Sequence, residues 1–152
     1  MTIAQNNFFI FTIILWKMRK ITNIIIHCSA TKEGVEFHSR DIDRWHKQRG
    51  WKGIGYHYVI CLDGSVEIGR KEEEIGAHCT NYNRNSIGIC YIGGLDKDGK
   101  PKDTRTTQQK AAMYKLLCDL KKKYPNAKIN GHRDFAAKAC PCFDAKEEYG
   151  EL

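Results

Sequence analysis

The sequence lacks any apolar run long enough to cross a bilayer as a helix, which takes about 20 residues. Residues 8–16 form a markedly apolar stretch of nine residues in which Thr12 is the only polar one. No basic residue precedes this stretch, and no small-residue cleavage site follows it before Ile21, so it is also a poor export signal. We expect residues 1–17 to be an apolar extension with a misassigned start, Met18 being the true start. The alternative is an uncleaved membrane-proximal anchor.

Internal repeats and low-complexity segments are also missing from the sequence. A chain of 152 residues is long enough for one domain with a substantial core and too short for two of ordinary size. We therefore expect one globular catalytic domain over residues 18–152.

The seven cysteines form no even framework of the kind that disulfide-stabilised secreted proteins carry. Several of them lie in apolar runs, where cysteine behaves as a small hydrophobic residue. Cys140 and Cys142 flank a proline and do not form a CxxC pair, which disfavours a zinc ribbon. This usage indicates a chain made in a reducing compartment.

The formal net charge of +7 and the pI near 9.0 indicate an anionic partner. Nucleic acid, membrane headgroups and an anionic bacterial wall all meet that description, and charge alone does not choose among them. The sequence has no basic arm and no repeated aromatic and basic motif typical of RNA binding. The lysine run at residues 121–123 ends a predicted helix, where positive charge is favoured by the helix dipole.

The pattern of apolar residues predicts strands and helices that alternate around one sheet. A continuous apolar run at residues 21–28 predicts a buried central strand. Ser39 is the expected N-cap of a first helix, and the pair Thr106 and Gln109 is a capping-box signature for a second. Asp63 and Gly64 predict a type I′ turn between two antiparallel strands. The predicted strands cover residues 21–28, 56–62, 65–70, 86–92 and 127–130, and the predicted helices cover residues 38–49, 106–124 and 143–149.

Three metal-ligating side chains stand where strands end or loops begin. His27 ends the first apolar run, His132 follows the last short strand, and Cys140 comes eight residues later. Two imidazoles and one thiolate are a ligand set of catalytic zinc, because three protein ligands leave the fourth tetrahedral position open to water. The pattern therefore predicts a hydrolase, although this sparse spacing alone leaves ordinary polar roles open.

The other histidines and one cysteine have competing interpretations. His38 and His46 lie on or beside the first helix and are expected to be surface or half-buried polar residues. Tyr56 and His57 point to opposite faces of a strand, so only one of them can face the same side as His27. His78 is a candidate cleft wall or substrate contact. A Cys28 nucleophile with a histidine base is geometrically awkward, because adjacent strand residues face opposite ways.

Taken together, these blocks resemble the zinc-dependent N-acetylmuramoyl-L-alanine amidases of the type 2 family, which includes lysozymes of phage T7 type and the animal peptidoglycan recognition proteins. The resemblance covers nearly all of residues 24–149. It implies an α/β fold with a single mixed central β-sheet flanked by helices. Cys142 departs from the family pattern, in which a small residue is typical beside the ligand. The matching blocks are HCSAT from His27, RWHKQRGWKGIGYHYVI from Arg44, DGSVEIGR from Asp63, GAHCTNYNRNSIGIC from Gly76, GHRDF from Gly131 and KACPCFD from Lys138.

The resemblance implies a role for each matching residue. One Zn²⁺ ion would be held by His27, His132 and Cys140. Tyr56 and Lys138 would be the catalytic pair. The predicted substrate contacts are His78, Arg84 and Asn85.

The reaction that the resemblance implies is hydrolysis of the amide between N-acetylmuramic acid and L-alanine in bacterial peptidoglycan. The alternative is a peptidoglycan-binding module without activity, but such members typically lack the cysteine ligand that Cys140 supplies here. We expect an endolysin-like monomer that binds peptidoglycan, binds no nucleic acid and does not insert stably into membranes. It would stay in the cytoplasm until lysis or specialised export and then act on the cell wall.

Overall fold

The computed structural model describes residues 18–152. The predicted extension and the predicted start at Met18 depend on residues 1–17, which lie outside this range, so they stay predictions. Within the described residues no helix is both long enough and apolar enough to cross a membrane.

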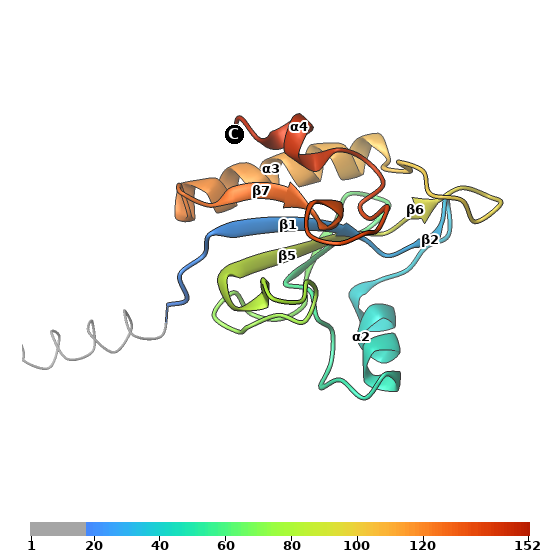
Figure 1. Cartoon of the computed structure of the whole chain (residues 1–152). Coiled ribbons are helices and arrows are strands. Elements are labelled where there is room, and N and C mark those ends of the chain that lie inside the picture. Colours follow the sequence, from blue (N-terminus) through green and yellow to red (C-terminus); the bar gives the residue numbers. More distant parts are fainter. Residues whose placement is uncertain (1–17) are drawn as a thin grey trace, which may run out of the picture.

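A mixed five-stranded sheet forms the centre of the molecule, with the order β4-β3-β5-β1-β7 (Figure 1). Strand β1 lies between β5 and β7 and runs parallel to both, and only β4 runs antiparallel to its neighbour. Strands β2 and β6 pair in a separate two-stranded sheet. The strands are β1 (Asn23–Cys28), β2 (Thr31–Lys32), β3 (Tyr58–Ile60), β4 (Val66–Ile68), β5 (Ser86–Tyr91), β6 (Gly94–Leu95) and β7 (Lys128–Gly131).

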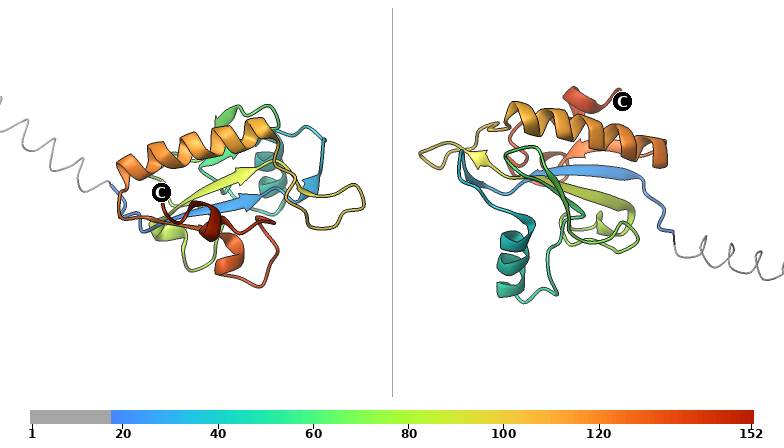
Figure 2. Two further views of the ribbon diagram at one scale, coloured as in Figure 1. Left: turned by 90° about the horizontal axis from the view of Figure 1, so that it is seen from above. Right: turned by 180° about the vertical axis from the view of Figure 1, so that it is seen from behind.

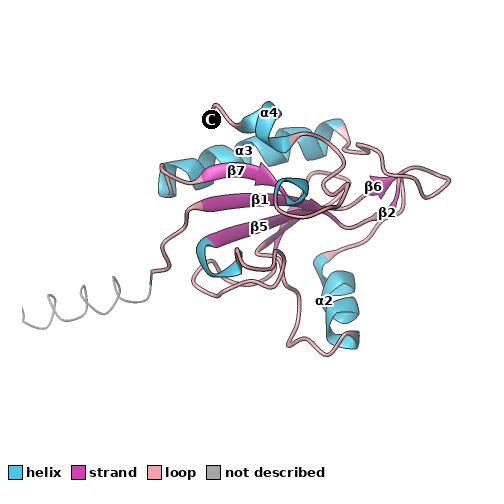
Figure 3. Cartoon of the chain, viewed as in Figure 1, coloured by secondary structure: helices cyan, strands magenta, loops and turns pink. Residues whose placement is uncertain are grey.

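Helices lie on both sides of this sheet, as the two further views show (Figure 2). Helices α3 and α4 cover one face, and α2 lies on the other side (Figure 3). The predicted α/β fold with one mixed central sheet and flanking helices is therefore confirmed. The helices are α2 (Ser39–Gln48), α3 (Thr107–Lys123) and α4 (Ala145–Tyr149), with short 3-10 helices η1 (Asn83–Asn85) and η2 (His132–Asp134).

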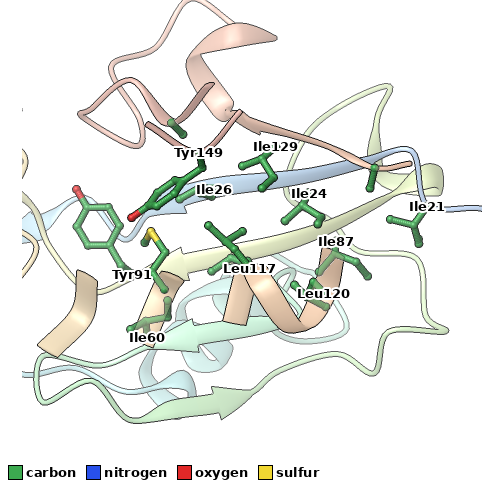
Figure 4. Packing of buried hydrophobic residues seen from close by; sticks show 14 of the residues in the cluster. Ile21, Ile24, Ile26, Ile60, Ile87, Tyr91, Leu117, Leu120, Ile129 and Tyr149 are labelled. Atoms are coloured by element: carbon green, nitrogen blue, oxygen red, sulfur yellow. The ribbon is translucent and has the colours of Figure 1, made fainter. Parts of the chain in front are cut away.

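The predicted central strand is confirmed by the burial of β1. Ile24, Ile25 and Ile26 are all completely buried. Ile24 and Ile26 pack with Leu117 of α3 in the larger core cluster (Figure 4). Full burial on both faces explains why this strand reads as a continuous apolar run without alternation.

Helix α3 begins with the predicted capping box. The Thr106 hydroxyl accepts the Gln109 N–H at 3.0 Å, and the Gln109 side chain accepts the Thr106 N–H at 3.0 Å. The buried Gln109 amide also donates to the carbonyls of Ile60 and Ile92 at 3.1 and 2.9 Å. One glutamine therefore caps the helix and fixes its start against the sheet.

Two local predictions are wrong. The N-cap of α2 is His38, not Ser39, since the His38 backbone is extended and its N–H donates to Asp41 at 2.8 Å, as at the start of a capping box. The turn at Asp63 and Gly64 is not type I′, which needs positive φ at both residues, because only Gly64 has it. The Gly64 N–H donates to the Cys61 carbonyl, as in a three-residue loop with glycine in the left-handed position.

Arg105 joins the segment before α3 to helix α4. Its side chain is 2% exposed and donates to both Asp103 oxygens at 2.9 Å and to Glu148 at 2.8 Å. It also donates to the Tyr149 hydroxyl at 2.9 Å and lies 3.4 Å from the Phe143 ring centroid. Because the buried guanidinium has this many partners, Arg105 holds helix α4 against the segment before α3 in one defined arrangement.

We predict that Arg105→Ala lowers the free energy of unfolding by about 3 kcal/mol, because it removes a buried guanidinium and leaves the partly buried Asp103 carboxylate without its partner. Urea unfolding followed by circular dichroism measures the change. Arg44→Ala is the matched control, since Arg44 makes only an exposed pair with Asp41 and should change stability by less than about 0.5 kcal/mol. Equal effects of the two substitutions would contradict this role for Arg105.

Candidate active site

A cleft of about 520 Å³ lies beyond the carboxyl end of β1. Five of the predicted site residues line it: Tyr56, His78, His132, Lys138 and Cys140. The remaining lining residues come mainly from α2 and from the loop after Gly76, and they include Trp45, His46, Arg49, Trp51, Ala77, Cys79, Thr80 and Asn83.

The predicted ligand residues His27, His132 and Cys140 meet at this cleft. One donor atom from each lies within 4.8 Å of the others. His27 Nδ1 is 3.9 Å from Cys140 Sγ, and the two imidazole centroids are 4.7 Å apart. His27 comes from β1 and His132 from the turn directly after β7, so parallel pairing of β1 and β7 brings both rings to the same edge.

The surroundings of the two histidines favour their neutral, metal-ligating form. Burial holds the pKa of His27 well below its ordinary value, and His78, His132 and Lys138 lower it further. Burial also lowers the pKa of His132. Cys140 Sγ accepts the Cys28 N–H at 3.3 Å. Neutral imidazoles and a thiolate are the donors that bind divalent metals of intermediate softness.

His78 lies behind His27 and orients its ring. His27 Nε2 is 2.8 Å from His78 Nδ1, and His78 Nε2 is 3.1 Å from Ser86 Oγ. When His27 uses the Nδ1 lone pair as a ligand, its Nε2–H donates to His78, whose own Nε2–H then donates to Ser86. This is the outer hydrogen-bond chain that fixes the tautomer of a metal-binding histidine.

A glycine makes room for the His78 ring. A Cβ on Gly88 would lie 2.6 Å from His78 Cγ, which is closer than non-bonded atoms can approach. The His78 N–H donates to Asn83 Oδ1 at 2.8 Å, which fixes the backbone on the other side. Gly88 and Asn83 are therefore supporting residues that the sequence pattern did not single out.

Tyr56 lies beside His27 on the cleft wall. Their ring centroids are 5.1 Å apart, and His46 lies 5.6 Å from Tyr56 on the other side. Burial raises the pKa of Tyr56 well above its ordinary value, with smaller contributions from Cys90 and Cys140, so the phenol stays protonated and can donate a hydrogen bond. Lys138 is exposed at the rim of the same cleft.

Arg84 and Asn85 do not line the cleft. Asn85 Nδ2 donates to the Lys20 carbonyl at 2.8 Å, and Asn85 accepts the Thr22 N–H near the start of β1. The cleft lies at the opposite end of β1, beyond His27. Their neighbour Asn83 is the member of η1 that does line the cleft.

Helix α2 supplies cleft residues that sequence reasoning left out. His46 is buried, more so than expected, and its Nδ1 accepts the Gly55 N–H at 2.9 Å. Burial lowers the pKa of His46 to about 4, so the ring is neutral. Trp45 and Arg49 are four residues apart and line the cleft from the same helix. The four-residue spacing of Trp45 and Arg49 in a predicted helix is the sequence feature from which their shared face could have been predicted.

Cys28 and Cys142 lie outside the donor set. Cys28 packs into the core cluster on the α3 side, as its alternation with His27 predicts. Cys142 Sγ is 3.8 Å from Cys28 Sγ. Of these three cysteines, Cys140 is the one whose sulfur belongs to the group of donor atoms that could hold a metal ion at this site.

We predict that Cys140→Ser weakens zinc binding at this site by at least about 100-fold, because hydroxyl oxygen replaces the thiolate ligand. Calorimetric titration of the chelator-treated chain measures it. Cys142→Ser is the matched control and should keep the tight binding. If both variants bind zinc as the wild type does, the assignment of the sulfur ligand is wrong.

The comparisons with known proteins agree with this geometry. Residues 17–143 match the family described as N-acetylmuramoyl-L-alanine amidase. The chain is 42% identical over 138 residues to the endolysin of Enterobacteria phage K11, covering 90% of this chain and 91% of that protein. It is 45% identical over 132 residues to the endolysin of Escherichia phage T7, covering 86% and 87%.

A solved structure gives the same result. The fold is similar to that of the N-acetylmuramoyl-L-alanine amidase LysC from Clostridium intestinale URNW, with a TM-score of 0.74 and 30% identity over 86% of this chain and 82% of that one. The chain belongs to the N-acetylmuramoyl-L-alanine amidase family, as its sequence motifs predict.

Proposed function

We propose that this chain hydrolyses the amide between N-acetylmuramic acid and L-alanine in peptidoglycan, with one zinc ion held by His27, His132 and Cys140. The observation that carries the proposal is the convergence of these three donors at the end of a cleft that Tyr56 and Lys138 also line. Membership of the amidase family supports the reaction.

The donor set fits zinc because two neutral imidazoles and one thiolate leave one tetrahedral position free. A zinc ion held by these three residues would supply Lewis acidity to a water molecule and to the amide carbonyl. The chain itself keeps both imidazoles neutral through burial and directs the His27 ring through His78.

We propose that Lys138 and Tyr56 stabilise the charges that develop during amide hydrolysis. The ammonium group of Lys138 stabilises negative charge on the carbonyl oxygen. The protonated phenol of Tyr56 is a hydrogen-bond donor to the attacking water or to the leaving amine. For His78 we propose a positioning role through His27, because both of its ring nitrogens already have partners.

The cleft beyond the donors suits a glycopeptide. Trp45 and Trp51 offer aromatic surface to a sugar ring, and Arg49 offers a positive charge to carboxylates of the stem peptide. The net charge of +7 agrees with an anionic wall as the partner. Arg84 and Asn85 stay predicted contacts, and they would require a substrate that extends beyond the cleft.

The biological role that fits these features is that of an endolysin, which is what the phage relatives are called. The chain would accumulate in the cytoplasm and reach the wall upon lysis. Binding without cleavage is the other candidate, and the presence of the Cys140 ligand beside Tyr56 and Lys138 favours catalysis over it.

We predict that Lys138→Met and Tyr56→Phe each lower the rate of wall hydrolysis by about 10²–10³-fold, because each removes one transition-state contact. The assay counts free L-alanine amino termini and reducing ends released from purified peptidoglycan. Lys115→Met is the matched control, since Lys115 is exposed on α3 and pairs with Asp119 of the same helix. Unchanged rates in both variants would refute these roles. New reducing ends would show that the chain cleaves glycosidic bonds and not the amide.

A second prediction concerns His78. His78→Phe should weaken zinc binding by about 10–100-fold, because the His27 Nε2–H loses its acceptor. His78→Asn should restore part of the affinity, since an amide oxygen can accept in place of Nδ1. Zinc affinity measured by competition with a chromogenic chelator is the readout. Equal affinities of the wild type and the Phe variant would show that His78 does not act through His27.

A further inference from the structure

A second group of metal-ligating side chains lies outside the active-site cleft. His38 caps α2, Cys61 follows β3, and Glu67 lies in the middle of β4. One donor atom from each lies within 4.8 Å of the others. None of the three lines the cleft.

The separations between these donors match a tetrahedral site. His38 Nδ1 is 3.2 Å from Glu67 Oε2 and 3.6 Å from Cys61 Sγ. Ligands bonded to zinc at ordinary N, O and S distances lie roughly 3.3 to 3.6 Å apart along the edges of a tetrahedron. An ion can therefore enter with little movement of the three side chains.

Outer contacts aim the donor atoms at one point. Glu36 Oε1 lies 3.0 Å from His38 Nε2, on the far side of the ring, and leaves Nδ1 facing Cys61. The Ser39 N–H binds Glu67 Oε1 at 2.8 Å and leaves Oε2 facing His38. A carboxylate behind a histidine, and a hydrogen bond behind a carboxylate, are the supports that metal ligands commonly have.

We propose that His38, Cys61 and Glu67 form a second site for a divalent transition metal of the zinc class. Nitrogen, sulfur and oxygen donors together suit zinc and do not suit magnesium or calcium. On binding, the Cys61 thiol and the His38 Nδ1–H each release a proton to solvent, so that the sulfur and the Nδ1 lone pair become ligands beside the Glu67 carboxylate. Water takes the fourth position, because the side chains of His38 and Glu67 are 24% and 33% exposed.

The ion would join the start of α2 to the hairpin of β3 and β4. Helix α2 carries Trp45, His46 and Arg49 to the cleft wall, so the second site would stabilise the position of that wall. Without an ion the same contacts are those of a His38–Glu67 ion pair and a weak Cys61 hydrogen bond. The experiment has to separate these two states.

Cobalt titration of the chelator-treated full chain separates them, because each thiolate–cobalt bond gives a near-ultraviolet absorption band. We expect two equivalents of thiolate-bound cobalt in the wild type and one in Cys61→Ala. Cys118→Ala is the matched control and should keep both, since Cys118 on α3 belongs to neither donor set. A single equivalent in the wild type, or two in Cys61→Ala, would overturn the proposal.

A second variant protects the test from a folding defect. His38→Gln keeps the buried Cys61 in place and should also bind one equivalent, with a far-ultraviolet circular dichroism spectrum like that of the wild type. Zinc should raise the unfolding temperature of Cys140→Ser but not that of Cys140→Ser combined with His38→Gln. Equal zinc-induced shifts in these two chains would also overturn the second site.

Discussion

The burial of His27 as a neutral imidazole is the constraint on which the rest of the site depends. His27 is 1% exposed and lies at the end of a central strand, where a charged ring would lose its hydration. Both ring nitrogens therefore need partners within the protein. His78 takes Nε2, and Nδ1 is left facing Cys140 and His132. The sheet makes this possible, since parallel pairing of β1 with β5 and β7 holds the strand that carries the ring.

The surroundings of the site follow from that arrangement. The absence of a side chain at Gly88 admits the His78 ring, and Ser86 on the same strand holds its far nitrogen. Tyr56 packs beside His27, and His46 packs beside Tyr56. A row of three aromatic rings therefore links the end of β1 to α2. A core of isoleucine on β1 and leucine on α3 keeps the strand in place, which gives the site a rigid base.

The parts of this molecule that were predictable from sequence are those with a strong local pattern. The apolar run of β1 and the capping box of α3 depend on neighbouring residues, and both were found. The N-cap of α2 lies one residue earlier than predicted, where Asp41 accepts the His38 N–H and Glu67, distant in sequence, accepts the Ser39 N–H. The two-residue strands β2 and β6 are too short to show any period.

Arg84 and Asn85 were adjacent to the relevant loop in sequence, but the turn at η1 directs Asn83 to the cleft instead. The group of His38, Cys61 and Glu67 comes from three elements, so only the folded chain brings it together.

The central claim is that the three donors around His27 hold a zinc ion that amide cleavage requires. The most direct measurement digests purified peptidoglycan with the chain as prepared, after removal of metal by a chelator, and after return of one equivalent of zinc. We predict release of free L-alanine amino termini by the first and third samples and none by the second, with no new reducing ends in any sample. Full activity of the metal-free chain, with its fold intact by circular dichroism, would contradict the claim.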